Sequence, residues 1–221
     1  MEEFLAPLIE SLEKFRNKER ADWFSGYLKN QFEFLGIDTS VRRSTVKEFV
    51  KKADPLSHDE LRGISLYLWD LPYREYQLSA LDILDLNKKK LHKTDISWVE
   101  HLIVTKSWWD TVDALSGWIC GEYFRKYPEQ ILVITGRWLE SGNMWLERSC
   151  LLFQLRYKKE TDTSLLADTI ERLSSRKEFF IRKAIGWILR QYSKTNPVWV
   201  REFLKTHELA ALSRREAEKY L

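Results

Sequence analysis

Residues 174–197 read SSRKEFFIRKAIGWILRQYSKTNP, and the spacing of their apolar side chains decides the fold class. A helix has about 3.6 residues per turn, which gathers the apolar residues on one face: Ile181, Ile185, Ile188, Leu189 and Tyr192. The opposite face carries three cations around one tryptophan: Lys183, Trp187, Arg190 and Lys194. This period of three and four residues predicts an amphipathic helix.

The position of Trp187 among cations has two interpretations. A surface tryptophan can be covered by the aliphatic stems of lysine and arginine side chains, with no role in function. Alternatively, an aromatic side chain set among phosphate-binding cations is an arrangement that nucleic-acid-binding surfaces use. The helix alone leaves both interpretations open.

The same helical period runs through the whole chain, and Gly 8 with Pro 5 leaves little turn chemistry for hairpins. Helices are predicted at 2–16, 19–34, 39–53, 57–70, 73–88, 95–105, 107–126, 128–141, 143–158, 162–174, 177–193, 196–206 and 213–220. Expected breaks are Asp54-Pro55, Leu71-Pro72, Tyr127-Pro128 and Asn196-Pro197, with C-caps at Gly36 and Gly142 and N-caps including Ser57, Asp162 and Ser213. Helical pairs recurring at about 30–40 residues predict an all-α fold, an α-solenoid of HEAT-like pairs forming one domain over 1–221. A compact helical bundle is the alternative.

Composition limits the possible functions. Lys+Arg 36 against Asp+Glu 33 gives a net charge of +3, so a basic surface has to come from segregation of charge. Neither the four histidines nor the two cysteines have metal-ligand spacing, so we expect no metal and no cofactor. The start is acidic and amphipathic, and no apolar run reaches the length of a membrane span. We therefore expect a cytoplasmic protein without membrane segments.

Two further stretches carry candidate site residues. In TKSWWDTVD (105–113), Lys106, Trp109 and Asp113 share one helix face, and Trp109 lies one turn before Asp113. On these residues alone, Asp113 is more often a solvated charge or a partner for arginine. In NMWLERSCLLFQLRYK (143–158), Arg148 is an ordinary surface arginine unless it faces the same cavity as Asp113.

These blocks resemble a known family. YLKNQFEFLGI (27–37), LWDLPYREYQ (68–77), VTKSWWDTVD (104–113), WLERSCLLFQLRYK (145–158), SRKEFFIRKAIGWILRQYSKTNP (175–197) and LSRREAEKYL (212–221) resemble the DNA alkylation repair glycosylases of the HEAT-like-repeat class, the AlkD family. The resemblance spans nearly the whole chain. It implies a stack of HEAT-like helical pairs whose basic concave face grips double-stranded DNA. It further implies an enzyme that hydrolyses the N-glycosidic bond of N3- and N7-alkylated purines. It also implies a catalytic set of Asp113, Trp109 and Trp187 with Arg148 beside them, and an aromatic contact at Tyr27.

The residue types suit this chemistry. An N3- or N7-alkylated purine is already cationic, so it leaves without a general acid, and one carboxylate can stabilise the charge that develops on the deoxyribose. DNA-binding roles are expected for Tyr27, Lys106, Lys183, Arg190 and Lys194, and phosphate contacts for Arg148 as well. The partner is then duplex DNA containing 3-methyladenine or 7-methylguanine, bound by a nucleoid-associated monomer. The alternatives are a non-catalytic solenoid that binds damaged or branched DNA, and a protein–protein scaffold.

Overall fold

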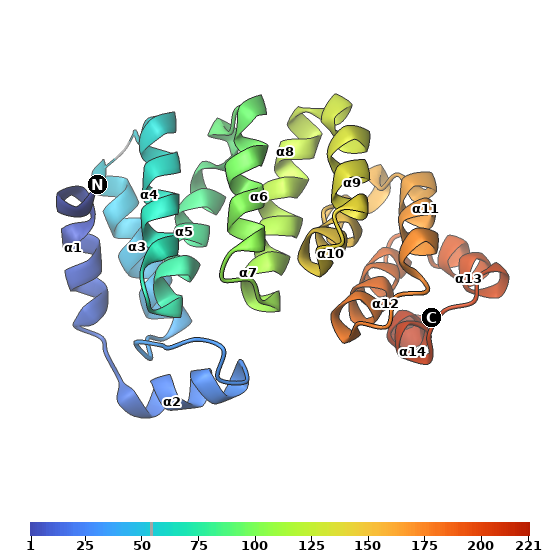
Figure 1. The fold of residues 1–221 in the computed structure, drawn as a ribbon, viewed down its shortest axis with the longest axis horizontal. Helices are drawn as coiled ribbons and strands as arrows, with labels where there is room; N and C mark the ends of the chain where they lie inside the picture. The colour runs from blue at the N-terminus through green and yellow to red at the C-terminus, as the bar shows by residue number, and fades with distance from the viewer. Residues whose placement is uncertain (54) are drawn as a thin grey trace. The chain divides into compact units, whose positions relative to one another are not determined.

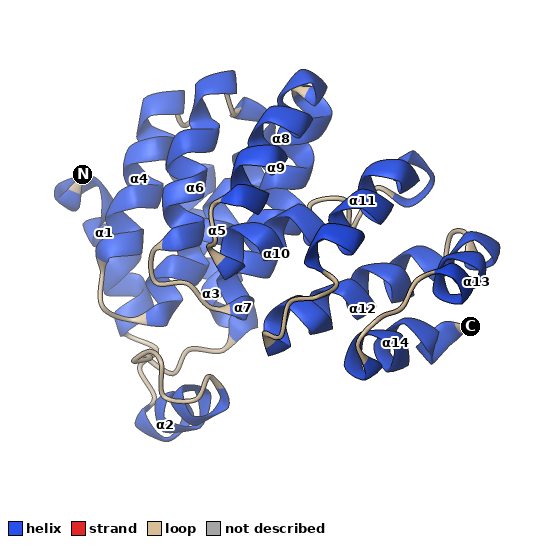
Figure 2. Cartoon of the chain, turned by 45° about the vertical axis from the view of Figure 1, so that its right-hand side comes forward, coloured by secondary structure: helices blue, strands red, loops and turns tan. Residues whose placement is uncertain are grey.

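The computed structural model describes residues 1–53 and 55–221 and is all-α (Figures 1 and 2), which confirms the predicted fold class. Asp54, half of one expected break, lies outside the described residues. The chain divides into two compact units, Met1–His92 and Lys93–Leu221, each described by itself below. That residues 1–221 form a single domain, and that this domain has a basic concave face, stay predictions.

The first unit is built from helical pairs (Figure 1). It contains α1 (Glu2–Glu13), α2 (Lys18–Tyr27), α3 (Thr39–Ala53), α4 (His58–Asp70), α5 (Arg74–Asn87) and the short turn η1 (Lys88–Lys90). Helix α5 packs against α4 and α3, and α3 packs against α1. Ser57 caps α4, since its hydroxyl accepts from the backbone N–H of Glu60 while the Glu60 carboxylate accepts from the Ser57 N–H.

Helix α2 ends at Tyr27, so the helix predicted over 19–34 is too long. The chain turns at Lys29 and Asn30, which both have positive φ. Beyond the turn, the buried Glu75 carboxylate accepts hydrogen bonds from the backbone N–H groups of residues 35, 36 and 37, at 2.8–3.1 Å. Gly36 is not a helix C-cap: it has a φ of 86° in this loop, where a Cβ would meet the carbonyl oxygen of Asn17.

The second unit is arranged around α10. It contains η2 (Lys93–Asp95), α6 (Ile96–Val104), α7 (Trp109–Ala114), the π-helical η3 (Leu115–Cys120), α8 (Gly121–Lys126), η4 (Pro128–Gln130), α9 (Ile131–Glu140), α10 (Met144–Leu152), η5 (Lys158–Glu160), α11 (Thr163–Leu173), α12 (Phe179–Ser193), α13 (Pro197–Thr206), α14 (Ala211–Ala217) and η6 (Glu218–Tyr220). Helix α10 packs against α6, α7, α9, α11 and α12. It is therefore the element that brings α7 and α12 to one place.

The helix predicted over 107–126 is divided in three. It starts at Trp109, after an extended Trp108, and passes through the π-helical η3 before continuing as α8. Within η3, the Ser116 hydroxyl donates to the Val112 carbonyl and lies 2.8 Å from the Ser149 hydroxyl of α10. Wide turns of this kind are common at functional sites, and this one begins two residues after Asp113.

Helix α14 lies directly on α12, as both ribbon views show (Figures 1 and 2). It starts at Ala211, so Ser213 is not its N-cap; the Ser213 hydroxyl instead donates to the Arg182 carbonyl at 2.8 Å. The close approach depends on Gly186, where a Cβ would lie 2.6 Å from the Ser213 carbonyl oxygen and 2.5 Å from Glu216 Cβ.

Gly186→Ala is expected to lower the free energy of unfolding by about 1–3 kcal/mol, because the added methyl group overpacks the α12–α14 contact. Gly136→Ala is the matched control, since Gly136 is also inside a helix and its Cβ would meet nothing within 4 Å. That control is expected to raise the free energy of unfolding by about 0.4–1 kcal/mol. Denaturant titration of both variants measures the difference, and equal effects would contradict the close contact.

Candidate active site

A bidentate ion pair joins Arg148 of α10 to Asp113 of α7. The Arg148 Nε donates to Asp113 Oδ1 at 2.7 Å, and its Nη2 donates to Oδ2 at 2.9 Å. Nη1 of the same guanidinium donates to the backbone carbonyl of Phe180 on α12. The Arg148 side chain is 3% exposed and that of Asp113 is 15% exposed. One arginine therefore holds the carboxylate in a fixed orientation and ties three helices together.

The environment of Asp113 opposes its ionisation. Burial raises the pKa of this carboxyl above its ordinary value of 3.8, and the hydrogen bonds and charge of Arg148 counteract that effect. The nearby Asp110 carboxylate raises the pKa further. Without Arg148 the carboxyl would therefore protonate at a still higher pH, so the arginine favours the charged form of this acid.

This geometry changes the interpretation of Arg148. A phosphate contact requires guanidinium donors at the surface, but these donors point at Asp113 and at the Phe180 carbonyl inside the unit. The expected phosphate contact therefore does not fit this residue. Arg148 and Asp113 do come together, in a direct ion pair. That the two side chains face one cavity stays a prediction.

An aromatic cluster of Trp108, Trp145 and Phe180 lies beside the ion pair. The ring centroids of Trp108 and Trp145 are 5.9 Å apart, and each is 5.1 Å from that of Phe180. The guanidinium carbon of Arg148 is 5.9 Å from the Phe180 ring. These rings limit water access to the arginine and so strengthen the field of the pair.

The two tryptophans of the predicted catalytic set come from different helices. Trp109 is the first residue of α7, one turn before Asp113, and is half-buried. Trp187 is half-buried on α12, opposite the isoleucines, which are fully buried as predicted. Since Phe180 and Trp187 are seven residues apart on α12, they share the helix face that Arg148 reaches. The convergence of both indoles on Asp113 stays a prediction.

The four cations expected to bind DNA differ in what their side chains or backbone contact. Lys183 and Arg190 both form ion pairs with Glu216 of α14, at 2.7 and 3.0 Å, which the sequence did not indicate. The Lys194 amine lies 4.9 Å above the Tyr220 ring. Lys106 has a φ of 47° in the connection between α6 and α7.

Tyr27 belongs to the first unit, where it ends α2. Its ring stacks on that of Trp23, with centroids 5.5 Å apart and planes inclined by 5°. Both side chains are exposed, and α2 buries none of its residues. An exposed aromatic pair on a helix is typical of a contact surface. The DNA contact of Tyr27 stays a prediction.

Sequence reasoning missed two site features. The Phe180 carbonyl has no sequence signal, because any residue has a backbone carbonyl. Glu216 had a weak signal: it lies in LSRREAEKYL, a stretch otherwise rich in cations, but nothing in the sequence placed α14 on α12.

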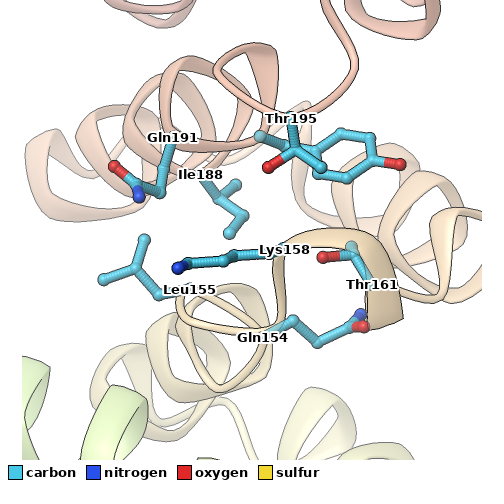
Figure 3. A pocket seen from close by; sticks show the side chains of 8 residues that line it. Gln154, Leu155, Lys158, Thr161, Ile188, Gln191 and Thr195 are labelled. Atoms are coloured by element: carbon cyan, nitrogen blue, oxygen red, sulfur yellow. The ribbon is translucent and has the colours of Figure 1, made fainter.

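A pocket lies elsewhere in the second unit, next to α12 (Figure 3). Its lining comprises Gln154, Leu155, Lys158, Thr161, Ile188, Gln191, Tyr192 and Thr195, and the Lys158 amine points toward Leu155 and Gln191. It contains none of the predicted site residues, so it is separate from the Asp113 site.

The described residues contain neither a metal-ligand cluster nor a helix that could span a membrane. Within residues 1–53 and 55–221, no three His, Cys, Asp or Glu side chains come together as metal ligands would. No helix in this part of the chain combines the length and apolar character needed to cross a membrane. The expected lack of a cofactor stays a prediction.

Comparison with known proteins now identifies the family. The model of the DNA alkylation repair enzyme family matches residues 8–221. The chain belongs to this family. A solved structure described as "Predicted DNA alkylation repair enzyme from Enterococcus faecalis" is similar, with 34% sequence identity and a TM-score of 0.87. The match covers 93% of this chain and 96% of that one. A search of curated proteins found no significant match.

Membership of the DNA alkylation repair enzyme family supports an enzyme role in DNA repair, with DNA as the partner. The solved relative has the same all-α fold, which confirms both the fold class and the family resemblance of the sequence.

Proposed function

We propose that this DNA alkylation repair family member is a DNA glycosylase that hydrolyses the N-glycosidic bond of N3- and N7-alkylated purines in duplex DNA. The observation that carries the proposal is the Asp113 carboxylate, buried and held through both oxygens by Arg148. Such a group suits a reaction whose difficulty lies in positive charge on the sugar.

The reaction needs little from the protein at the base. An alkylated purine carries positive charge, and it leaves as a neutral base when the electrons of the N-glycosidic bond move to it. The deoxyribose then develops positive charge, which a nearby carboxylate stabilises electrostatically. Water adds to the sugar carbon and loses a proton, completing hydrolysis. Asp113 would stabilise the sugar and orient this water.

The ion pair with Arg148 is compatible with that role. Each carboxylate oxygen has more than one acceptor direction, so a bidentate arginine leaves acceptor capacity for a water molecule. Because Arg148 favours the charged form of a buried acid, it preserves the charge that the reaction needs. Its role here is to position Asp113 rather than to touch DNA.

Trp109→Ala and Trp187→Ala are each expected to slow excision less than loss of the Asp113 charge. An indole face near a cationic sugar or base contributes about 0.5–2 kcal/mol, which corresponds to about 2- to 30-fold in rate. Trp187→Phe keeps an aromatic face and should retain more of the rate than Trp187→Ala. Single-turnover excision measures each variant, and an unchanged rate in both alanine variants would contradict a cation–π role.

A direct experiment tests the proposal. The protein is incubated with duplex DNA containing one 7-methylguanine, and the free base is measured by chromatography. Release above the spontaneous rate is expected, while undamaged guanine should stay in the duplex. Binding of this duplex without release of base would contradict the proposal.

The second candidate is a non-catalytic protein that binds damaged or branched DNA. The observation that favours it is the completeness of the Arg148–Asp113 pair, which resembles a structural ion pair between helices. In that case the basic residues of α12 would still bind DNA, and substitution of Asp113 would change stability only.

A further inference from the structure

Glu216 of α14 lies at the centre of a group of cations. It forms ion pairs with Lys183 at 2.7 Å, Arg190 at 3.0 Å and Lys219 at 2.7 Å. Lys183 and Arg190 come from α12, whereas Lys219 comes from η6 at the end of the chain. Three cations share one carboxylate, so this group holds two positive charges in excess.

The carboxylate and the cations differ in exposure. The Glu216 side chain is 5% exposed, whereas those of Lys183, Arg190 and Lys219 are 37%, 23% and 45% exposed. The negative charge therefore lies behind the cations, and the excess positive charge faces outward. Each lysine ammonium has three donors, so the bond to Glu216 leaves others available for an anion.

Burial alone would disfavour the charged form of Glu216, but the hydrogen bonds and charges of Lys183 and Lys219 outweigh it and lower the pKa to about 2. Glu216 is therefore ionised at any pH at which the protein would meet DNA. The backbone supports this arrangement, because Gly186 allows α14 to approach α12 closely at the same level.

The cations are also placed next to a predicted site residue. Lys183 and Arg190 lie four residues before and three residues after Trp187 on the same face of α12. Lys194 continues this face one turn later, with Tyr220 of η6 beneath its amine. Successive phosphates of one strand would meet a row of amines on both sides of Trp187.

We infer that Glu216 and Lys219 complete a phosphate-binding site for the DNA backbone beside Trp187, with Glu216 as a positioning residue and Lys219 as a third phosphate-binding cation. This inference rests on the proposed binding of duplex DNA. It assigns the end of the chain to the DNA contact, and it gives the acidic residue a role that supports anion binding.

Lys219→Gln tests the cation. It removes one charge at an exposed position, and affinity for undamaged duplex should fall about three- to tenfold at about 0.1 M salt, with the salt slope reduced by about one. Lys205→Gln is the matched control, because Lys205 forms the same i, i+3 ion pair at 2.7 Å, with Glu202 on α13. Lys219→Arg keeps the charge and should bind nearly as the unmodified protein does.

Glu216→Gln tests the positioning role. By charge alone, removal of a carboxylate makes the protein more cationic and should tighten DNA binding. If Glu216 instead aligns the three cations, binding should weaken about three- to tenfold, with a smaller salt slope, although the net charge has risen. All titrations are made below the unfolding midpoint of each variant. Tighter binding by Glu216→Gln would overturn the positioning role.

The outcomes separate this inference from the proposed function. Equal affinities for Lys219→Gln and Lys205→Gln would overturn the inference, whatever the excision result. Weaker binding by Lys219→Gln in a protein that releases no 7-methylguanine would uphold the inference and contradict the glycosylase. A last experiment measures thermal unfolding with added inorganic phosphate at constant ionic strength. If phosphate stabilised the unmodified protein but not Lys219→Gln, and the two proteins bound DNA equally well, the site would bind free phosphate. That result would overturn the DNA contact.

Discussion

Asp113→Asn is expected to slow release of 7-methylguanine by about 10²-fold or more, because it removes the charge that stabilises the developing sugar cation. Asparagine has nearly the same size and can still accept a hydrogen bond from Arg148. Affinity for the duplex should stay nearly unchanged or rise slightly, since one negative charge near the phosphates is lost. Single-turnover excision at saturating protein measures the chemical step apart from binding.

The control for this substitution is Asp110→Asn, which removes a carboxylate one turn earlier on the same helix. Asp110 raises the pKa of Asp113, whereas Asp113 is the carboxylate that Arg148 holds through both oxygens. Its loss should therefore leave the excision rate close to that of the unmodified protein. Asp113→Asn also leaves the buried guanidinium without its counter-charge, so its thermal unfolding is recorded and excision is measured well below the midpoint. Unchanged release by Asp113→Asn would favour the non-catalytic DNA-binding protein.

The fold class follows from the sequence because helical periodicity is a local property. The apolar face of residues 177–193 could be assigned from spacing alone, and the structure buries that face while Lys183, Arg190 and Lys194 stay at least partly exposed. Trp187 is half-buried and packs against the core. Start signals also act locally. Ser57 and Asp162 cap their helices as predicted, because a cap needs only the next few residues.

Features set by distant residues could not be predicted in this way. Helix α2 ends early because Glu75, more than forty residues after Tyr27, binds the backbone of the following loop. The π-helical turn after Asp113 has no composition of its own, so one long helix was predicted there. Helical propensity describes neither effect, since both depend on tertiary contacts.

In the candidate site, too, local features could be predicted from the sequence and features that depend on tertiary packing could not. Spacing placed Trp109 beside Asp113 on one helix, and the family resemblance supplied the other members. The pairing of Asp113 with Arg148 depends on the packing of α7 on α10, and the Phe180 bond depends on the packing of α10 on α12. Spacing alone left Arg148 an ordinary surface arginine, and the phosphate contact was expected after the resemblance, because an arginine on a helix surface and a buried one have the same local pattern.

Arg148→Met is expected to lower the excision rate at neutral pH by about 10- to 10²-fold, because the carboxylate loses the fork that orients it. It should also move the pH dependence. The reaction needs ionised Asp113, so activity falls as the pH drops through the pKa of this carboxyl, which is already raised by burial. Since Arg148 lowers that pKa, its removal raises it further, and the acid limb of the rate profile moves to higher pH.

Arg148→Lys separates charge from geometry in the same assay. Lysine keeps the positive charge but is a point donor without the bidentate fork, so the acid limb should stay close to that of the unmodified protein while the rate is still reduced. Affinity for undamaged duplex and its salt slope should change little in either variant, because the guanidinium is buried and engaged by Asp113 and Phe180. A salt slope reduced by about one in Arg148→Met, with the acid limb unmoved, would restore the phosphate contact and contradict the positioning role.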